Sequence, residues 1–326
     1  RFGIWFEPEC ISIDSDLYRA HPEWAVAVPG RNPVLSRNQL ILNFSRKDVQ
    51  DYLIERISDV LQSAPITYVK WDFNRSICDK YSHALPADRQ GEMAHRFILG
   101  LYRVLETLTR DFPQVLFEGC SGGGGRFDAG MLYYTPQIWC SDDTDAIERL
   151  QIQYGTSFGY PVSAMGAHVS AVPNHQTGRM TPLSTRGCVA MAGTFGYELD
   201  LNKLTEEEKE EISGQIRTFK EFYDCIQYGD YYRLTSPLSG SCTVWETVAP
   251  DASEALVSAV YHHVQANPVP VYVKLRGLEE KASYRLSLVG KEEEMTLSGA
   301  ALMHAGLPIP PAKGDYCAWQ IHLVRI

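Results

Sequence analysis

The stretch YVKWDFNR (68–75) places Lys70, Asp72 and Asn74 at alternate positions after an apolar run. Alternate residues of an extended strand point to the same side, so these polar groups share one face of the strand end. A structural ion pair between Asp72 and a neighbouring cation would explain two of them. Three are hard to explain by packing, because burying an unpaired carboxylate costs several kcal/mol. The segment therefore indicates a cleft in which these groups act on a ligand.

A second acidic cluster, WCSDDTDAIERL (139–150), contains Asp142, Asp143 and Asp145. A patterned helix follows, and acids favour a helix N-terminus, so capping accounts for one or two of the three. A calcium loop is a weaker alternative, since oxygen ligands are few and no EF-hand pattern is present. A DDxD metal–diphosphate site is weaker still without an all-helical fold.

A glycine-rich segment, FEGCSGGGGRFD (117–128), follows another apolar run. Four glycines could cradle a phosphate, but the segment lacks the GK[ST] of a P-loop and matches a dinucleotide fingerprint poorly. We favour a close approach of the backbone to a ligand. Cys120 and Gly123 would then form a wall that only small residues permit.

Aromatic and basic residues accompany these groups. Trp5 lies in IWFEPE, beside Glu7 and Glu9, and a Trp at a strand end can stack on a sugar face. Arg37, in VLSRNQLILNFS, adds a cation. By itself, neither Trp5 nor Arg37 indicates a particular function.

Two acids at the ends of different strands suggest glycoside hydrolysis, which needs a pair of carboxyls across the scissile bond. Asp72 would be ionised in order to attack, with Lys70 as the neighbouring cation that keeps it so. Asp142, near Trp139 and other acids, would have a raised pKa and could serve as the acid.

Residues 1 to about 230 alternate strand-like and helix-like patterns, which predicts βαβ units and a parallel sheet. Helices are expected over residues 49–61, opened by Ser45, and over 93–108, and a capping box of Thr205 and Glu208 opens a third that extends to Ile226. The expected strands are 2–6, 66–71, 114–119, 137–141, 161–165 and 194–201.

Polar groups follow four of these strands, which favours a (β/α)8 barrel over a doubly wound sheet with one switch point. Six strands where eight are needed imply that the first two precede residue 1. From residue 231 the pattern becomes β-rich. We therefore predict an N-terminally truncated catalytic barrel over 1–230 and a small antiparallel β domain over 231–326.

The net charge of −10 argues against a nucleic-acid partner. No window reaches the roughly 18 apolar residues of a membrane span, so no membrane association is expected. The eight cysteines are scattered without a CxxC pair, and several lie in apolar contexts, as reduced buried thiols do. These features favour a cytoplasmic protein.

Over essentially its whole length the chain resembles the bacterial α-galactosidases of glycoside hydrolase family 36. The segments that carry the resemblance, in this order, are WFEPE, SDLYRAHPEW, YVKWDFNR, FEGCSGGGGRFD, WCSDDTDAIERL, HQTGRMTPLSTRGCVAM and GYELDL. The resemblance implies hydrolysis of terminal α-galactosyl residues from oligosaccharides such as melibiose and raffinose, with retention of configuration. It implies no metal or organic cofactor, and it suggests a homo-oligomer, possibly a tetramer, for the full-length protein.

By the resemblance, Asp72 matches the family nucleophile and Asp142 the general acid/base, with their carboxyls about 5–5.5 Å apart. The matched substrate-binding positions divide into three groups: Lys70, Asn74 and Arg37 for galactose hydroxyls or the carboxylates, Trp5 and Trp139 for the pocket walls, and Cys120 and Gly123 near the sugar C2 and C3. The last group would leave little room for an N-acetyl substituent.

The chain departs from the family pattern in one respect. The family has a pair of acids after the second barrel strand, and in this protein that strand would lie upstream of residue 1. We therefore expect residues 1–326 alone to be weakly active or inactive. Alternatives are a raffinose or stachyose synthase-type transglycosidase, an α-N-acetylgalactosaminidase, which Cys120 disfavours, and a non-catalytic galactoside-binding fragment, which has no need of both acids.

Overall fold

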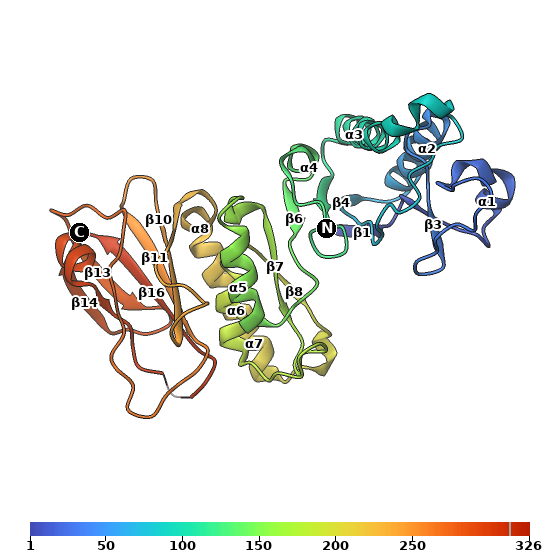
Figure 1. Ribbon diagram of the computed structural model, residues 1–326. Coiled ribbons are helices and arrows are strands. Elements are labelled where there is room, and N and C mark those ends of the chain that lie inside the picture. The colour runs from blue at the N-terminus through green and yellow to red at the C-terminus, as the bar shows by residue number, and fades with distance from the viewer. Residues whose placement is uncertain (313) are drawn as a thin grey trace. The chain divides into compact units, whose positions relative to one another are not determined.

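The computed structural model describes residues 1–312 and 314–326, which divide into two compact units (Figure 1). Unit 1 is Arg1–Trp139 and unit 2 is Cys140–Ile326. The helical segments of unit 1 are α1 (Asp16–Ala20), η1 (Pro22–Trp24), α2 (Lys47–Ser63), η2 (Ala87–Glu92), α3 (Met93–Asp111) and α4 (Ala129–Tyr134). Its strands are β1 (Phe2–Phe6), β2 (Cys10–Ser12), β3 (Gln39–Ile41), β4 (Ile66–Trp71), β5 (Leu116–Gly119) and β6 (Gln137–Trp139).

Unit 2 continues with the remaining elements. Its helical segments are α5 (Ala146–Thr156), η3 (Val162–Ala164), α6 (Leu183–Ala190), η4 (Leu201–Lys203), α7 (Glu206–Glu221), α8 (Tyr223–Tyr228) and the π-turn η5 (Ala301–Ala305). Its strands are β7 (Met165–Ser170), β8 (Thr194–Glu198), β9 (Asp230–Arg233), β10 (Cys242–Val248), β11 (Glu254–Tyr261), β12 (Tyr272–Val273), β13 (Ser283–Leu288), β14 (Glu294–Ser298), β15 (Leu307–Pro308) and β16 (Cys317–Arg325).

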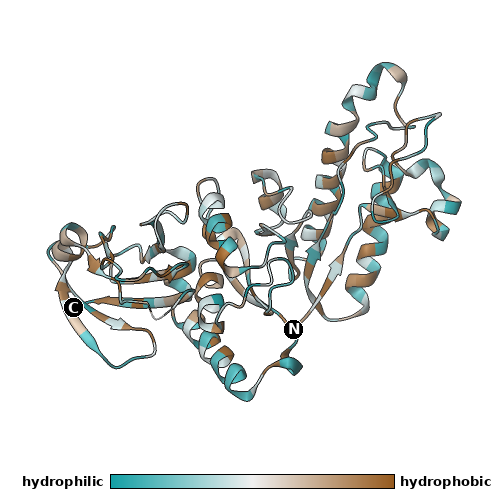
Figure 2. Cartoon of the chain, turned by 60° about the horizontal axis from the view of Figure 1, so that its bottom comes forward, coloured by the Kyte–Doolittle hydropathy of each residue, from teal (hydrophilic) through white to brown (hydrophobic). Residues whose placement is uncertain are grey.

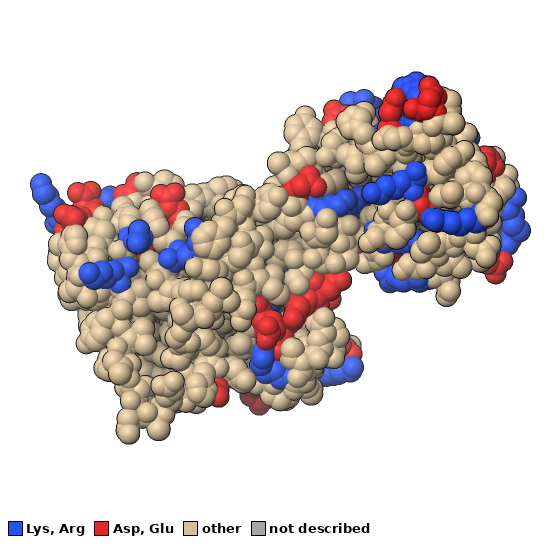
Figure 3. Space-filling model, in the orientation of Figure 1, with Lys and Arg blue, Asp and Glu red and all other residues tan. Residues whose placement is uncertain are grey.

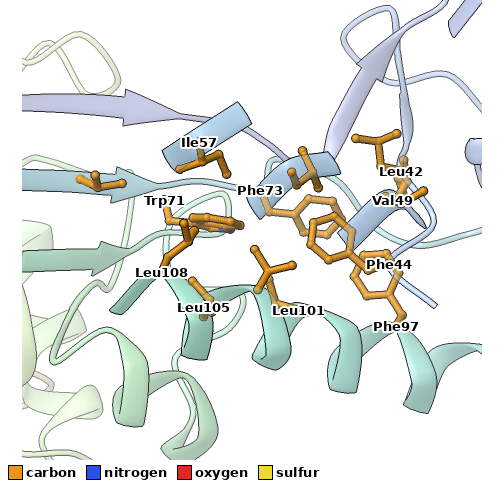
Figure 4. Packing of buried hydrophobic residues seen from close by; sticks show 14 of the residues in the cluster. Leu42, Phe44, Val49, Ile57, Trp71, Phe73, Phe97, Leu101, Leu105 and Leu108 are labelled. Atoms are coloured by element: carbon orange, nitrogen blue, oxygen red, sulfur yellow. The ribbon is translucent and has the colours of Figure 1, made fainter. Parts of the chain in front are cut away.

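In unit 1 the strands β1, β4, β5 and β6 pair in this order, and all of these pairs are parallel. Trp71 and Phe73, at the end of β4, pack with Leu101 and Leu105 of α3 and with Ile57 of α2 (Figure 4). Apolar residues spaced by three and four along each helix place one side of the helix on the sheet. Figure 2 shows the same feature as alternating hydrophobic and hydrophilic stretches along the helical ribbons.

The close contact between α3 and the segment before α2 depends on Gly100. A β-carbon at this position would lie 1.8 Å from the Phe44 carbonyl oxygen, which no side chain can tolerate. The same carbonyl accepts a hydrogen bond from Gln50 Nε2 at 2.7 Å. Glycine therefore fixes how deeply this helix packs onto the core of unit 1.

Unit 2 contains the parallel pair β7 and β8 and an antiparallel sheet ordered β14-β13-β16-β11-β10-β9. β10 is buried along its whole length, as is β11 after its first residue. One face of these strands lies in the core of the β-rich region, and the other carries Trp245 and Val260 against Ala146 of α5 and Cys188 of α6. Burial on both faces extends to the polar side chains of these strands, among them Thr243, Glu246 and Ser258.

Most predicted elements are confirmed, including the Thr205–Glu208 capping box of α7. The strand predicted at 161–165 is wrong, because Pro161 begins a short 3-10 turn and β7 starts only at Met165. Ser45 does not cap α2: Arg46 occupies that position without a side-chain cap, and Ser45 hydrogen-bonds Asn43 instead. The third predicted helix ends at Glu221, so its last apolar residue belongs to α8.

None of the eight cysteines forms a disulfide in the described chain. Basic and acidic side chains are interspersed on the face seen in Figure 3, and many pair locally, as Arg89 and Glu92 do at 2.8 Å. None of the described helices has both the length and the apolar character that crossing a membrane requires. The domain boundary at 230/231 stays a prediction, since the compact units divide elsewhere.

Glu246 is a buried acid in the β-rich part of unit 2. It lies between Val244 and Val248 on the strand face that packs into that core, with no exposed surface. Its Oε2 accepts a hydrogen bond from the Arg276 amide at 3.0 Å, whereas Oε1 has no partner among the described residues. Burial raises the pKa of Glu246 to about 8.

We predict that Glu246→Gln removes a pH-dependent loss of stability. A carboxyl whose pKa is raised on folding stabilises the fold below its unfolded pKa, near 4.5, and this contribution is lost as the pH rises to about 8. At pH 8.5 the free energy of unfolding of the variant should exceed that of wild type by about 1–3 kcal/mol, and at pH 5 the two values should be similar. Denaturant unfolding at both pH values measures this, with the exposed Glu293→Gln as the control. Equal pH dependence in wild type and Glu246→Gln would contradict the assignment.

Candidate active site

The polar groups of unit 1 meet because neighbouring parallel strands are in a fixed register. Trp5 of β1 is paired with Lys70 of β4, and Lys70 with Glu118 of β5. Side chains alternate between the two faces of a sheet. Asp72, two residues after Lys70, and Cys120, two residues after Glu118, therefore lie on the same face as Lys70. Trp71, between Lys70 and Asp72, points to the opposite face and into the core. The register thus gathers the chemical groups on one face at the carboxyl ends of the strands.

Asp72 is the centre of this cluster, and its residue is only 7% exposed. Its carboxylate accepts hydrogen bonds from the Phe73 amide (2.8 Å), Asn74 Nδ2 (2.6 Å) and Trp5 Nε1 (3.2 Å). The Cys120 thiol is a further donor. Burial raises the pKa of Asp72, but these hydrogen bonds outweigh burial, and the pKa lies below its ordinary value. Asp72 is therefore an ionised carboxylate in a largely water-excluded position.

Lys70 is not the group that the sequence led us to expect beside Asp72. Its ammonium lies 3.4 Å from Glu118 Oε1 and 4.8 Å from the centroid of the Trp139 ring. Neutral donors, and not an ion pair with Lys70, stabilise the charge of Asp72. The prediction failed because residue spacing gives the face of a side chain but not its partner on the next strand.

Asn74 links Asp72 to a second acid. Glu7 Oε1 accepts hydrogen bonds from the Asn74 amide (3.1 Å) and from Asn74 Nδ2 (2.9 Å). The Arg37 guanidinium lies 3.6 Å from the same oxygen and is more than half exposed. Arg37 is thus brought to the site through Glu7. Glu9, by contrast, is fully buried and forms a bidentate pair with Arg126, so its role is structural.

The glycine-rich segment folds over the end of β4. Gly123 has a φ of +77°, which favours glycine, and its amide donates to the Cys120 sulfur. Burial raises the pKa of Cys120 to about 12, so it remains a thiol that can donate to Asp72. Ser121 Oγ donates to the Phe73 carbonyl oxygen at 3.0 Å. These contacts fit the interpretation of a close wall beside a ligand.

A pocket of about 640 Å³ lies beside this cluster in unit 1. Its lining comes from the segment after β4, including Asn74 and Arg75, and from the glycine-rich segment, including Ser121 and Gly122. Arg75 itself donates to the carbonyl oxygens of Gln39 and Val34. The pocket has room for a small ligand at the edge of the Asp72 cluster.

The acids of residues 142–145 lie in unit 2 and have different roles. Asp145 is buried and caps α5, accepting from the Ile147 amide at 2.8 Å and from Arg179 at 2.6 Å. Burial raises the pKa of Asp145, but hydrogen bonds from Thr177, the Ile147 amide and Arg179 bring it below its ordinary value. Asp143 accepts from the Asp145 amide at 3.0 Å. The capping interpretation is therefore confirmed for Asp145, and Asp142 is the solvent-exposed acid of the three.

Arg149 fixes the chain segment that carries Asp142. It is a buried residue of α5 that donates to the Ser141 carbonyl oxygen at 3.1 Å and also to the Gly166 carbonyl oxygen of β7. Burial lowers the pKa of Arg149. A buried guanidinium bonded to backbone carbonyls holds them rigidly, so the residue before Asp142 has a defined position within unit 2.

Sequence reasoning missed Glu118 and Tyr68. Glu118 is 2% exposed and accepts a hydrogen bond from the Tyr68 hydroxyl, while its other oxygen faces Lys70. The alternation of Glu118 with Cys120 in FEGCSGGGGRFD could have placed it on the site face. Among the described residues, no group of three His, Cys, Asp or Glu side chains could hold a metal ion.

Comparisons with known proteins agree over the whole chain. Residues 1–229 match the Melibiase family model, and residues 242–323 match the glycosyl hydrolase family 36 C-terminal domain. The chain is 55% identical to the bifunctional alpha-galactosidase/sucrose kinase AgaSK of Mediterraneibacter gnavus and 52% identical to alpha-galactosidase AgaA of Geobacillus stearothermophilus. All of this chain is aligned, but only 34% and 44% of those proteins.

The solved structures include two variants of Geobacillus AgaA, one in complex with raffinose and one with stachyose. Each is 52% identical to this chain, covering 100% of it and 45% of the AgaA chain, with TM-scores of 0.96 and 0.97. This similarity confirms the predicted fold class, an incomplete parallel α/β barrel followed by an antiparallel β domain.

We predict that Asn74→Ala moves the acid limb of the activity profile to higher pH. The substitution removes the 2.6 Å hydrogen bond to Asp72, so the desolvation that raises the pKa of Asp72 is less well opposed. Relative to wild type, the kcat/KM of the variant should fall at least several-fold further at pH 4.5 than at pH 7. The full-length protein is assayed across this range, with the exposed Asn32→Ala as the control. An acid limb that stays in place would contradict the role of Asn74.

Proposed function

This chain belongs to glycoside hydrolase family 36, and from that premise we propose that it carries the catalytic groups of a retaining α-galactosidase. The chain spans less than half the length of the curated relatives that it matches. The activity is therefore proposed for the full-length protein. Residues 1–326 alone are expected to be weakly active or inactive.

The observation that carries the proposal is the environment of Asp72. A buried carboxylate that is kept ionised by neutral donors is a nucleophile ready to attack. In the first step, Asp72 bonds to the anomeric carbon as the bond to the leaving oxygen breaks, and Asp142 gives its proton to that oxygen. In the second, Asp142 takes a proton from water, the water oxygen bonds to the anomeric carbon, and Asp72 is released. Two inversions give retention.

Two observations support Asp142 as the acid/base. It is solvent-exposed after β6, whereas Asp145 is committed to capping α5. In addition, the aspartates substituted in the raffinose and stachyose complexes of Geobacillus AgaA stand 70 positions apart, as Asp72 and Asp142 do here. An exposed position also suits a group that must exchange its proton with water between the two steps.

The remaining groups would bind the galactosyl unit. Lys70 and Asn74 would donate hydrogen bonds to its hydroxyls. Arg37 would either donate to a hydroxyl as well or hold the Glu7 carboxylate in place. Trp5, which is half exposed, and Trp139 would form the walls of the pocket. Cys120 and Gly123 would line the region of C2, where they leave little room for an N-acetyl group.

The complexes of Geobacillus AgaA with raffinose and stachyose support raffinose-type oligosaccharides as substrates, with melibiose as a smaller one. No cofactor takes part in this mechanism, because both carboxyls come from the protein. A homo-oligomer, such as a tetramer, and a cytoplasmic location are parts of the same proposal.

We predict that Asp72→Ala lowers turnover of an aryl α-galactoside by roughly a thousandfold or more in the full-length protein. Added azide fits the space of the lost carboxylate and should restore product as the β-galactosyl azide. The control is the exposed Asp224→Ala, which should keep wild-type turnover. Rates and product anomers are measured by chromatography and NMR.

The other outcomes separate the alternatives. Full activity of Asp72→Ala would make the cluster structural and would refute the assignment. Galactose binding by wild type without turnover would support a binding protein. Galactosyl transfer to a sugar acceptor in preference to water would support a transglycosidase. The same assay on residues 1–326 measures the activity of the isolated chain.

A further inference from the structure

Glu118 is a buried carboxylate on the site face that the mechanism above does not use. It lies on β5 two residues before Cys120, and its side chain is 3% exposed. An acid buried to this extent is costly unless it is paired or hydrogen-bonded. Its place in the fold therefore needs a reason beyond packing.

The partners of Glu118 come from the neighbouring strand. Lys70 is its register partner on β4, with Nζ 3.4 Å from Oε1. The Tyr68 hydroxyl donates to Oε2. Burial raises the pKa of Tyr68, and the nearby Glu118 carboxylate raises it further, so Tyr68 stays a phenol that can donate. Tyr68 orients the carboxylate from one side while Lys70 approaches its other oxygen.

The Lys70 side chain has four rotatable carbons and no fixed direction of its own. Two contacts hold its ammonium: the Glu118 carboxylate and the face of the Trp139 ring, 4.8 Å away. Asp72 is the obvious competitor, since it is two residues further along the same face. A lysine pulled to Asp72 would occupy the carboxylate that must attack. Glu118 offers Lys70 another charge partner, so Asp72 keeps its neutral donors.

We propose that Glu118 is a positioning residue for catalysis, an inference that rests on the function proposed above. It holds the Lys70 ammonium at the Trp139 ring, ready to donate to a substrate hydroxyl, and away from Asp72. Glu118 itself does not touch the substrate. Its effect on the reaction therefore passes through Lys70.

A double-mutant cycle in the full-length protein tests this dependence, with Glu118→Gln, Lys70→Met and the double variant assayed on an aryl α-galactoside. Glu118→Gln keeps the shape of the side chain and its contact with Tyr68 but removes the charge. We expect it to lower kcat/KM about 10–100-fold, mainly through KM. In the Lys70→Met background the same change should have little further effect, because the group through which it acts is gone.

The control is the exposed Glu293→Gln in the β-rich part of unit 2, which should leave kcat/KM unchanged. If Glu118→Gln fails to fold, as judged by thermal unfolding, the same cycle is run with Glu118→Asp, which keeps the charge but withdraws it from Lys70. That variant should raise KM by a smaller factor.

Additive effects of the two substitutions, or an unchanged kcat/KM for Glu118→Gln, would overturn the positioning role. A purely structural glutamate would give additivity together with a lower unfolding temperature. Failure of the proposed function is a separate result, because in that case the wild-type protein itself would not turn over α-galactosides.

Discussion

A carboxylate that must stay charged while largely buried sets the requirements for unit 1. Little water reaches Asp72, so the protein has to supply donors, and it supplies neutral ones. Trp5 comes from β1, Asn74 from the segment after β4, and Cys120 from the end of β5. These donors converge only if the parallel strands keep their register. A slip of one residue between strands would turn Trp5 or Cys120 to the opposite face, away from Asp72.

Buried ion pairs and glycines then hold the register and the connecting segments. Gly100 lets α3 pack closely onto the chain before α2, which fixes the helix beneath β4. Glu9 accepts from the Trp71 indole at 2.8 Å and from the two terminal nitrogens of Arg126, so it ties the glycine-rich segment to β4, which directly precedes Asp72. In unit 2, Arg149 does the same for the segment of Asp142. A buried ion pair such as Glu9–Arg126 adds little net stability, because desolvation offsets most of its attraction.

The sequence predicted the features that depend on local patterns. Apolar runs located the strands, spacing by three and four located the helices, and the alternation of Lys70, Asp72 and Asn74 placed them on one face. It did not predict that Lys70 pairs with Glu118, because that contact depends on the register between two strands almost fifty residues apart. The buried Glu246 was missed for a similar reason. Its run, CTVWETVA, resembles any half-polar strand until the packing on both faces is known.

The proposed mechanism depends above all on a covalent bond between Asp72 and the sugar. The most direct measurement is trapping of the full-length protein with a fluorinated galactosyl fluoride, which forms the glycosyl-enzyme quickly and hydrolyses slowly, followed by peptide mass spectrometry. We expect one galactosyl label per chain, on the peptide that contains Asp72, with loss of activity in proportion to labelling. A label on any other residue, or an active enzyme that is never labelled while inverted product accumulates, would contradict it.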